Sequence, residues 1–554
     1  MASFFPAKLA DPPSPRDVVA NYQRTFDNHA SEGKLRPMVL PYHLYGVILL
    51  GIYLCVRHTN RPILYKARWI VLAAITWFQL KTLWHTSSTN MAFSFVAGLM
   101  STYGIATSLT WLVFMRPQFD AKRVERRKIP KDKTVTKNSE GRATAYAGSI
   151  ESDTRQRSKP NGEPNGIPDS PKVPNRNDVG SAHGRPAADG TMEETEYYWQ
   201  SYPENIRERL DWISDLVINF RGPGWNWAIP SLPKPPPSVY AKLGEHVDEV
   251  SRKDTSSTGI KCFTTRQEVF RAQVPRFIIG YFLLDVVKTT MMNDPYFWLG
   301  PNDYAMPVYI AAMSPSIRCL YRELLSMAGV LISIDMVFLL PPLTMCLLLG
   351  PSSFMGLRGE AWYYPTTWGS FSVFANKGLA GLWGGAWHQI FRLIFSAPTN
   401  YLIANGYLNP RSPTTKLVAS FFAFGLSGIL HAGGSISQIP STKPWAPPVF
   451  FMLQAVGIVL QTGLCTLLRQ HIKKIPKFIR QLTNVIYAVS WGFLTGWLLA
   501  DDFARGGIWL YEPIPISILR GMGFAGRDHG WWCWKHAGIG WYTGEHWWES
   551  GIAI

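Results

Sequence analysis

Two histidines lie in strongly apolar stretches of this chain: His388 within LWGGAWHQ (382–389) and His431 at the end of FGLSGILH (424–431). An ionisable side chain is costly inside a membrane, so such a residue is by default a hypothesis of function. Burial keeps an imidazole neutral, which suits it to act as a general base. For a single histidine, a hydrogen bond to a neighbouring carbonyl explains the position equally well. Two of them, each among small residues, favour a chemical role.

Acyl transfer from a thioester to an alcohol is the reaction that this pair suits. The base takes the hydroxyl proton as the oxygen attacks the carbonyl, a contribution of roughly 10²–10⁴ in rate. Direct attack needs no nucleophilic serine or cysteine, and no GxSxG motif is seen. His388, between Trp387 and Gln389, is then a hydrogen-bonding group near the thioester or its developing oxyanion. Ser427 is a small residue that permits close helix packing.

The elements that hold these residues are apolar runs of membrane-spanning length. They predict an all-α polytopic membrane protein, with about eight transmembrane helices around an intramembrane reaction chamber. We expect a kink or break at Pro341 and Pro342, and a structural bond from Asp285 or Asp335 to a neighbouring helix or a buried cation. The predicted crossings cover residues 41–56, 69–80, 91–115, 274–287, 320–349, 417–433, 449–468 and 485–500.

The segment that carries His388 does not fit a simple crossing. Lys377 precedes residues 378–405, and Arg411 and Lys416 follow them. Basic residues favour the cytosolic side, so both flanks are expected there. We therefore predict a re-entrant segment, whose irregular backbone is tolerated where it lines a cavity.

Charge and composition also suggest how the chain is divided. Basic residues at 57–68 and 116–128 predict cytosolic ends and a luminal N-terminus. Ile206, Leu210, Ile213, Val217 and Phe220 recur at helical spacing and predict an amphipathic helix. The expected parts are a luminal polar tail (1–37), the first three transmembrane helices (38–115), a disordered basic cytosolic insertion (116–200), a cytosolic amphipathic helix with a Trp-rich turn (201–272), a catalytic membrane core (273–500) and an aromatic-rich C-terminal cap (501–554).

Other classes of partner are not expected. The net charge of +17 comes mainly from Lys and Arg beside membrane segments and in one polar loop, so it indicates membrane topology and no nucleic acid. The six cysteines contain no CxxC, and we expect neither a disulfide framework nor a metal site. His529, His536 and His546 lie in the aromatic C-terminal region, but their spacing matches no common zinc pattern.

These motifs together resemble a known family. LWGGAWHQ is similar to the FWGRRWHQ-type signature of wax-synthase-like acyltransferases, a branch related to the membrane-bound O-acyltransferases, and FGLSGILH resembles the FxxSGxxH helix that carries the catalytic histidine of that superfamily. RGPGWNW (221–227) and residues 501–517 are similar to fungal members, many of which acetylate terpenoid or meroterpenoid hydroxyls. The chain departs from the signature at Leu382 and at Gly385 and Ala386, where the family has Phe and two arginines.

The resemblance implies His431 as the general base and His388 in the place of the superfamily's second polar residue. We expect Trp383, Trp387, Gln389, Arg392, Ser427 and Asp335 to bind acyl-CoA or the second substrate. The sequence thus predicts an O-acyltransferase of the endoplasmic reticulum membrane. It would move an acyl group, expected to be acetyl, from coenzyme A to a hydrophobic alcohol, with no permanently bound cofactor. A long-chain wax-ester synthase and a membrane transporter are the alternatives.

Overall fold

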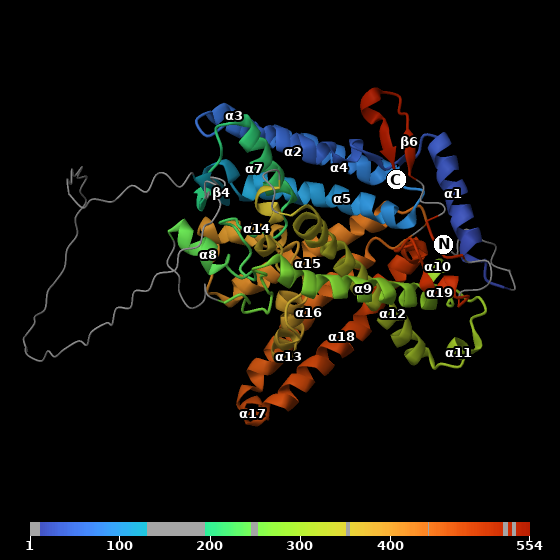
Figure 1. The fold of residues 1–554 in the computed structure, drawn as a ribbon. Helices are drawn as coiled ribbons and strands as arrows, with labels where there is room; N and C mark the ends of the chain where they lie inside the picture. Colours follow the sequence, from blue (N-terminus) through green and yellow to red (C-terminus); the bar gives the residue numbers. More distant parts are fainter. Residues whose placement is uncertain are drawn as a thin grey trace, which may run out of the picture. The chain divides into compact units, whose positions relative to one another are not determined.

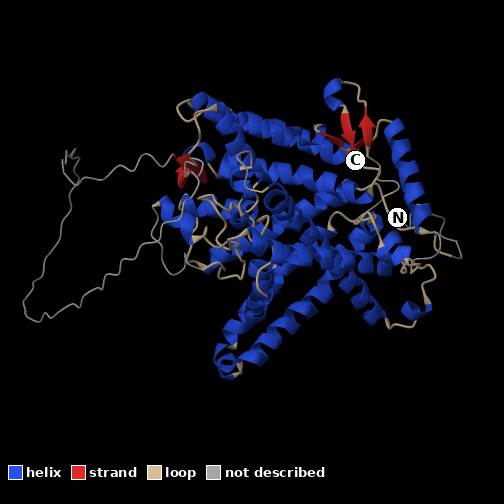
Figure 2. Ribbon diagram, in the orientation of Figure 1, coloured by secondary structure: helices blue, strands red, loops and turns tan. Residues whose placement is uncertain are grey.

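The computed structural model describes residues 11–129, 194–244, 253–350, 355–440, 442–524, 530–534 and 539–554. The chain divides into two units: Met1–Arg126 with Tyr197–Ile554, and Arg127–Glu196. Most of the predicted insertion at 116–200 lies outside the described residues. The first unit is mainly helical in its described part (Figures 1 and 2).

The helices are connected by short loops and a few short strands. In chain order the α-helices are α1 (Pro15–Ser31), α2 (Tyr45–Cys55), α3 (Pro62–Lys66), α4 (Arg68–His85), α5 (Met91–Leu109), α6 (Pro117–Asp120), α7 (Ile206–Ile218), α8 (Pro237–Tyr240), α9 (Arg266–Met291), α10 (Tyr296–Leu299), α11 (Val308–Ala311), α12 (Pro315–Pro341), α13 (Phe371–Gly381), α14 (Arg392–Ala404), α15 (Pro413–Ile436), α16 (Ala446–Leu467), α17 (Arg469–Lys474), α18 (Lys477–Gly506) and α19 (Ile518–Gly521). Strand β1 (Arg36–Pro37) pairs with β3 (Thr86–Ser87), and β4 (Arg123–Ile129) pairs with β5 (Glu194–Gln200). In a third sheet β7 (Gly551–Ala553) lies between β2 (Val39–Leu40) and β6 (Gly540–Tyr542) and pairs with both.

Within the described ranges, six helical stretches have the length and apolar composition to cross a membrane. They are Pro62–His85, Met91–Phe114, Pro315–Leu349, Pro413–Ile436, Ala446–Leu467 and Lys477–Gly506. The all-α polytopic membrane fold is thus confirmed, and six of the predicted crossings match these stretches. The other two correspond to the shorter apolar helix Tyr42–Cys55 and to α9, a 26-residue helix with charged residues near both ends.

The predicted break at the two prolines is confirmed. Helix α12 ends at Pro341, and the chain continues as a π-helical segment, Pro342–Leu349. Proline lacks an amide hydrogen and its ring clashes with the preceding turn, so two in succession interrupt the α-helical hydrogen bonds.

Small residues bring the helix of His431 against α5. Helix α5 packs between α4 and α15, and α16 packs between α15 and α18 (Figure 1). At the α5–α15 contact a Cβ added to Gly98 would lie 2.0 Å from the carbonyl oxygen of Gly433, so only glycine fits. The Ser437 hydroxyl donates to the Ser94 carbonyl at 2.6 Å. Such close backbone approach is typical of membrane helix pairs, and here it fixes the position of α15.

The segment that carries His388 is broken, as predicted. Helix α13 is interrupted at Gly378, whose φ of 60° and ψ of −136° suit only glycine. The Leu379 amide at this break donates a hydrogen bond to the side-chain oxygen of Gln461 in α16, at 2.9 Å. A π-helical turn, Leu382–Ala386, follows, and α14 begins only at Arg392. Helices of 11 and 13 residues are shorter than the roughly 20 residues that a crossing needs.

The predicted amphipathic helix exists as α7, and its buried face coincides only in part with the predicted apolar stripe. Ile206 and Leu210 are 53% and 52% exposed, whereas Trp212, Ile213 and Leu216 form the buried face. The reason is a polar network that a hydrophobic pattern does not reveal. It turns Asp215 inward together with Trp212.

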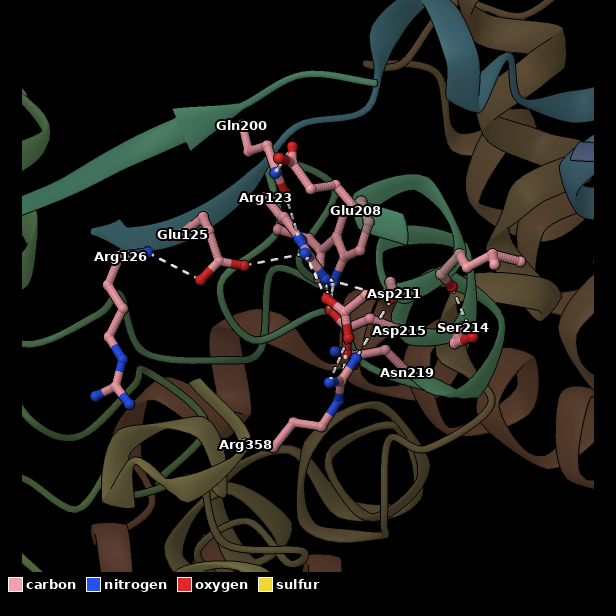
Figure 3. A network of polar contacts seen from close by, with 12 residues as sticks. Arg123, Glu125, Arg126, Gln200, Glu208, Asp211, Ser214, Asp215, Asn219 and Arg358 are labelled. Atoms are coloured by element: carbon pink, nitrogen blue, oxygen red, sulfur yellow. Dashed lines mark hydrogen bonds and ion pairs between the residues drawn. The ribbon is translucent and has the colours of Figure 1, made fainter. Parts of the chain in front are cut away.

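This network joins α7 to β4 and to the loop before α13 (Figure 3). Arg123 donates to Asp211 at 2.6 Å, and Arg358 donates to the same carboxylate at 2.7 Å. Asp215 accepts from Trp225 Nε1 at 2.9 Å and from the Tyr363 hydroxyl at 2.6 Å, while burial raises its pKa. A pocket of about 180 Å³ lies among these groups. The network anchors the turn at 221–227, which begins beside the candidate site.

Candidate active site

His431 lies in the C-terminal half of α15, between two phenylalanine rings. Its imidazole stacks on Phe451 of α16, with centroids 4.9 Å apart and planes 6° apart, and the Phe95 ring of α5 lies 6.3 Å away. Its Nδ1 atom is buried and has no hydrogen-bond partner in the described part of the chain. The imidazole is thus held in place by ring contacts and retains an unused nitrogen.

His388 lies in the loop between the π-helical turn and α14, outside the six membrane-length stretches. Trp387, Trp368 and Phe391 surround it, with ring centroids 5.3, 5.8 and 6.1 Å away. Its Nδ1 atom is also buried without a partner among the described residues. Burial lowers the pKa of His388 to about 3, with smaller contributions from His431 and Arg221. His388 is therefore neutral at physiological pH.

A series of aromatic rings connects the two histidines. Trp387 contacts Trp383 at 5.2 Å, and Trp383 contacts Phe451 at 6.0 Å. Phe451 is the ring on which His431 stacks. Trp383 also packs on Phe424, the phenylalanine of the FxxSGxxH pattern, with ring centroids 5.8 Å apart. The structure therefore brings both predicted histidines and both predicted tryptophans into one aromatic cluster.

Gln389 and Arg392 shape the loop that carries His388. The Gln389 amide donates to the carbonyls of Trp383 and Trp387 at 2.9 and 2.8 Å, and its oxygen accepts from Arg392 at 2.7 Å. Arg392 also donates to the Gly384 carbonyl at 3.0 Å. These bonds close the turn between Trp383 and Arg392, so this geometry gives both residues a role in shaping the loop.

Asp335 is bonded to a cation on a neighbouring helix, as predicted. It accepts from Arg276 of α9 at 2.6 Å and from Trp368 Nε1 at 2.8 Å. Trp368 is the ring that contacts His388, so Asp335 acts on the site through this indole. Asp285 accepts from the Ser517 hydroxyl and the Leu519 amide, which ties α9 to the C-terminal region.

Ser427 lies next to the closest contact between α15 and α16. A Cβ on the following Gly428 would be 2.6 Å from Cα of Pro448. This agrees with the interpretation of the Ser-Gly pair as small residues that allow close packing.

Several residues of the site were not predicted as such. Phe451 and Phe391 are ordinary apolar residues in the sequence, and nothing in their spacing distinguishes them. Trp368 was not among the predicted site residues, although an indole so near the apolar segment of His388 is a usable signal. Arg221 lies 167 positions before His388 in the chain.

Of the three C-terminal histidines, His546 lies within the described residues. His529 and His536 lie outside the described residues. His546 lies with Glu545 and Glu549, their possible ligand atoms within 4.8 Å of one another, and Glu549 pairs with Arg36 at 2.6 Å. These three residues were not predicted to lie together.

Comparisons with known proteins agree with this geometry. Residues 364–453, which include both histidines, match the family described as "Membrane bound O-acyl transferase family". The O-Mevalon transferase yanI of Aspergillus niger is 23% identical over 303 residues, which cover 52% of this chain and 60% of the relative. Acetyltransferase ple2 of Rhodocybe pseudopiperita is 25% identical over 326 residues, 57% of this chain and 74% of the relative. Acetyltransferase spyB of Aspergillus fumigatus is 33% identical over 103 residues, 18% of this chain and 17% of the relative. No solved structure matches the chain significantly.

The fold is that of an integral membrane protein, and residues 364–453 match a family of acyltransferases. Within that class, the chain is similar to fungal acetyltransferases of the membrane-bound O-acyltransferase type, and the resemblance predicted from the sequence is confirmed. The chain spans less than two thirds of the length of several of these relatives, about 60% for the O-Mevalon transferase.

Proposed function

We propose that this protein transfers an acetyl group from acetyl-CoA to a hydroxyl of a hydrophobic, terpenoid-type acceptor in the endoplasmic reticulum membrane. The observation that carries the proposal is the pair of histidines with buried, unpartnered Nδ1 atoms in one aromatic cluster. A buried histidine with a purely structural role uses at least one ring nitrogen in a hydrogen bond to the protein, as His43 does with its Nε2. The names of the acetyltransferase relatives support acetyl as the transferred group.

In the proposed reaction His431 is the general base. Its free imidazole nitrogen takes the hydroxyl proton as the acceptor oxygen bonds to the thioester carbonyl carbon, forming a tetrahedral oxyanion. When that intermediate collapses, the carbon–sulfur bond breaks and the thiolate of coenzyme A takes the proton from the imidazolium. Stacking on Phe451 fixes the plane in which the base presents its nitrogen.

His388 has a different role in this proposal. A neutral imidazole near the thioester carbonyl donates a hydrogen bond to the oxyanion and does not carry the proton. The Gln389 and Arg392 bonds hold its loop closed, and Trp368 limits its ring on one side. The apolar acceptor would enter from the lipid, and the phosphates of coenzyme A would meet Lys and Arg at the cytosolic face.

The test measures acyl transfer by the purified full-length protein in nanodiscs, with mass-spectrometric analysis of products from candidate terpenoid alcohols. We expect His431→Asn to lower kcat by about 10²–10⁴. His43→Asn is the matched control, because His43 is buried and also has an unpartnered Nδ1, but its Nε2 bonds the Ala97 carbonyl at 2.9 Å. Full turnover by the His431 variant would exclude it as the base, and a preference for palmitoyl-CoA over acetyl-CoA would indicate a wax-ester synthase.

A further inference from the structure

Arg221 is a cation near His388 that has no acidic partner. Its Nη1 and Nη2 atoms donate to the backbone carbonyls of Thr366 and Pro365 at 2.8 and 2.7 Å. A guanidinium has five N–H donors, so these two bonds leave three unused. Among the described residues no carboxylate forms an ion pair with Arg221. Burial lowers its pKa to about 10.

Two other arginines of this region pair with carboxylates. Arg276 pairs with Asp335 at 2.6 Å, and Arg358 pairs with Asp211 at 2.7 Å. Arg392, like Arg221, bonds uncharged oxygens, those of Gly384 and Gln389. Arg221 is partly buried, and a partly buried charge without a counter-charge is costly because the protein replaces only part of its hydration.

The position of Arg221 connects it to the reaction centre. Burial is the main cause of the lowered pKa of His388, and the charges of His431 and Arg221 contribute less. The preceding residue, Phe220, contacts Phe391 at 5.9 Å, and Phe391 contacts His388 at 6.1 Å. Arg221 also donates a hydrogen bond to the carbonyl of Thr366. Two residues further along the chain, Trp368 contacts His388. Arg221 is thus joined, through Phe220 and through residues 365–366, to the segments that carry two of the rings around His388.

A structural clamp is the simpler explanation of the two carbonyl bonds. A clamp explains why the 221–227 turn is joined to residues 365–366. It does not explain why the donor at position 221 is a charged arginine. A neutral amide side chain makes such bonds without burying a charge.

We propose that Arg221 supplies fixed positive charge to the reaction centre and stabilises the oxyanion formed on the thioester carbonyl during acyl transfer. This inference rests on the proposed function. As the acceptor oxygen bonds to the carbonyl carbon, the thioester oxygen gains one negative charge, which is returned when the carbon–sulfur bond breaks. Preorganised positive charge aimed at such a developing anion lowers the barrier without reorganisation. Arg221 is thus a positioning residue, which acts on the anion through its field and through the His388 loop.

The experiment separates charge at the carbonyl from binding of the phosphates of coenzyme A. Full-length wild type, Arg221→Gln and Arg221→Lys are assayed in nanodiscs with acetyl-CoA and with S-acetylpantetheine, a thioester without phosphates. We expect Arg221→Gln to lower kcat about 10²-fold with both donors. We expect Arg221→Lys, which keeps the charge, to recover most of the loss.

The matched control is Arg209→Gln. Arg209 also donates to backbone carbonyls, those of Pro203, Cys55 and Glu204, but it makes no contact with the aromatic cluster of the two histidines. Thermal unfolding of both variants reports the loss of the carbonyl bonds. We expect similar unfolding shifts for the two, with the kcat loss confined to Arg221→Gln.

Four outcomes would overturn the inference. A loss seen only with acetyl-CoA, as a higher KM, would make Arg221 a phosphate-binding residue. Equal losses in Arg221→Gln and Arg221→Lys that follow thermal unfolding would make it a clamp. Normal kcat in Arg221→Gln would leave it without a role while the proposed function stands. An inactive wild type would remove the proposed function and this inference with it.

Discussion

The imidazole of His431 stacks on Phe451 at 4.9 Å with planes only 6° apart. Because α15 and α16 are brought close at Gly428, this stacking is a direct consequence of helix packing. It holds the ring while leaving Nδ1 without a partner. A base held by ring contacts keeps its nitrogens available for substrate.

The first prediction concerns this stacking. Phe451→Leu preserves apolar volume but removes the flat surface that orients His431, so we expect kcat to fall about 10- to 100-fold. Phe450→Leu is the matched control, because Phe450 contacts Trp383 and Phe451 and no contact with His431 is found for it. Both variants are assayed for acetyl transfer at saturating donor. Equal losses in the two variants would mean that general packing, and not orientation of the base, matters.

The second prediction concerns the break that carries His388. Gly378→Ala places a Cβ 2.0 Å from Nε2 of Gln461 at a φ that alanine rarely adopts. We expect it to destabilise the protein by about 1–3 kcal/mol. Gly463→Ala is the control, since this glycine lies in α16 with nothing within 4 Å of an added Cβ. In a helix interior that substitution stabilises by up to about 1 kcal/mol. Thermal unfolding in detergent measures both, and a neutral Gly378→Ala would contradict the structure at this kink.

How much of the site the sequence predicts depends on the kind of signal. His388 and His431 stand out because an ionisable residue in an apolar run is costly, and the irregular path near Gly378 follows from basic residues on both flanks. Phe451 and Arg221 could not be predicted, because their roles arise from the register of α15 on α16 and from a turn far along the chain. The buried face of α7 was predicted only in part for a similar reason, since its buried Asp215 is explained only by partners distant in sequence.

The third prediction concerns the bond between Trp368 and Asp335. Trp368→Phe keeps a ring against His388 but removes the donor that lies 2.8 Å from Asp335. In a double-mutant cycle of the free energy of unfolding with Asp335→Ala, we expect a coupling free energy of about 1.5–3 kcal/mol, which is typical of a hydrogen bond to a charged group. Trp362→Phe serves as control, because the Trp362 Nε1 has no partner in the described chain. Additive effects of Trp368→Phe and Asp335→Ala would show that the bond contributes nothing.

The fourth prediction concerns acid stability and His388. Its pKa is about 3 in the folded protein, whereas an unfolded histidine titrates near pH 6.5. Below about pH 6.5 the unfolded chain therefore binds a proton that the folded chain does not, and stability falls as the pH decreases toward about 3. One such group contributes a slope of up to about 1.4 kcal/mol per pH unit. We expect His388→Asn to lose stability less steeply than wild type between pH 6 and pH 4, measured as free energy of unfolding in detergent. His471→Asn, at an exposed position on α17, is the control. Parallel wild-type and His388→Asn curves would show that the imidazole is as accessible to protons in the folded protein as in the unfolded chain.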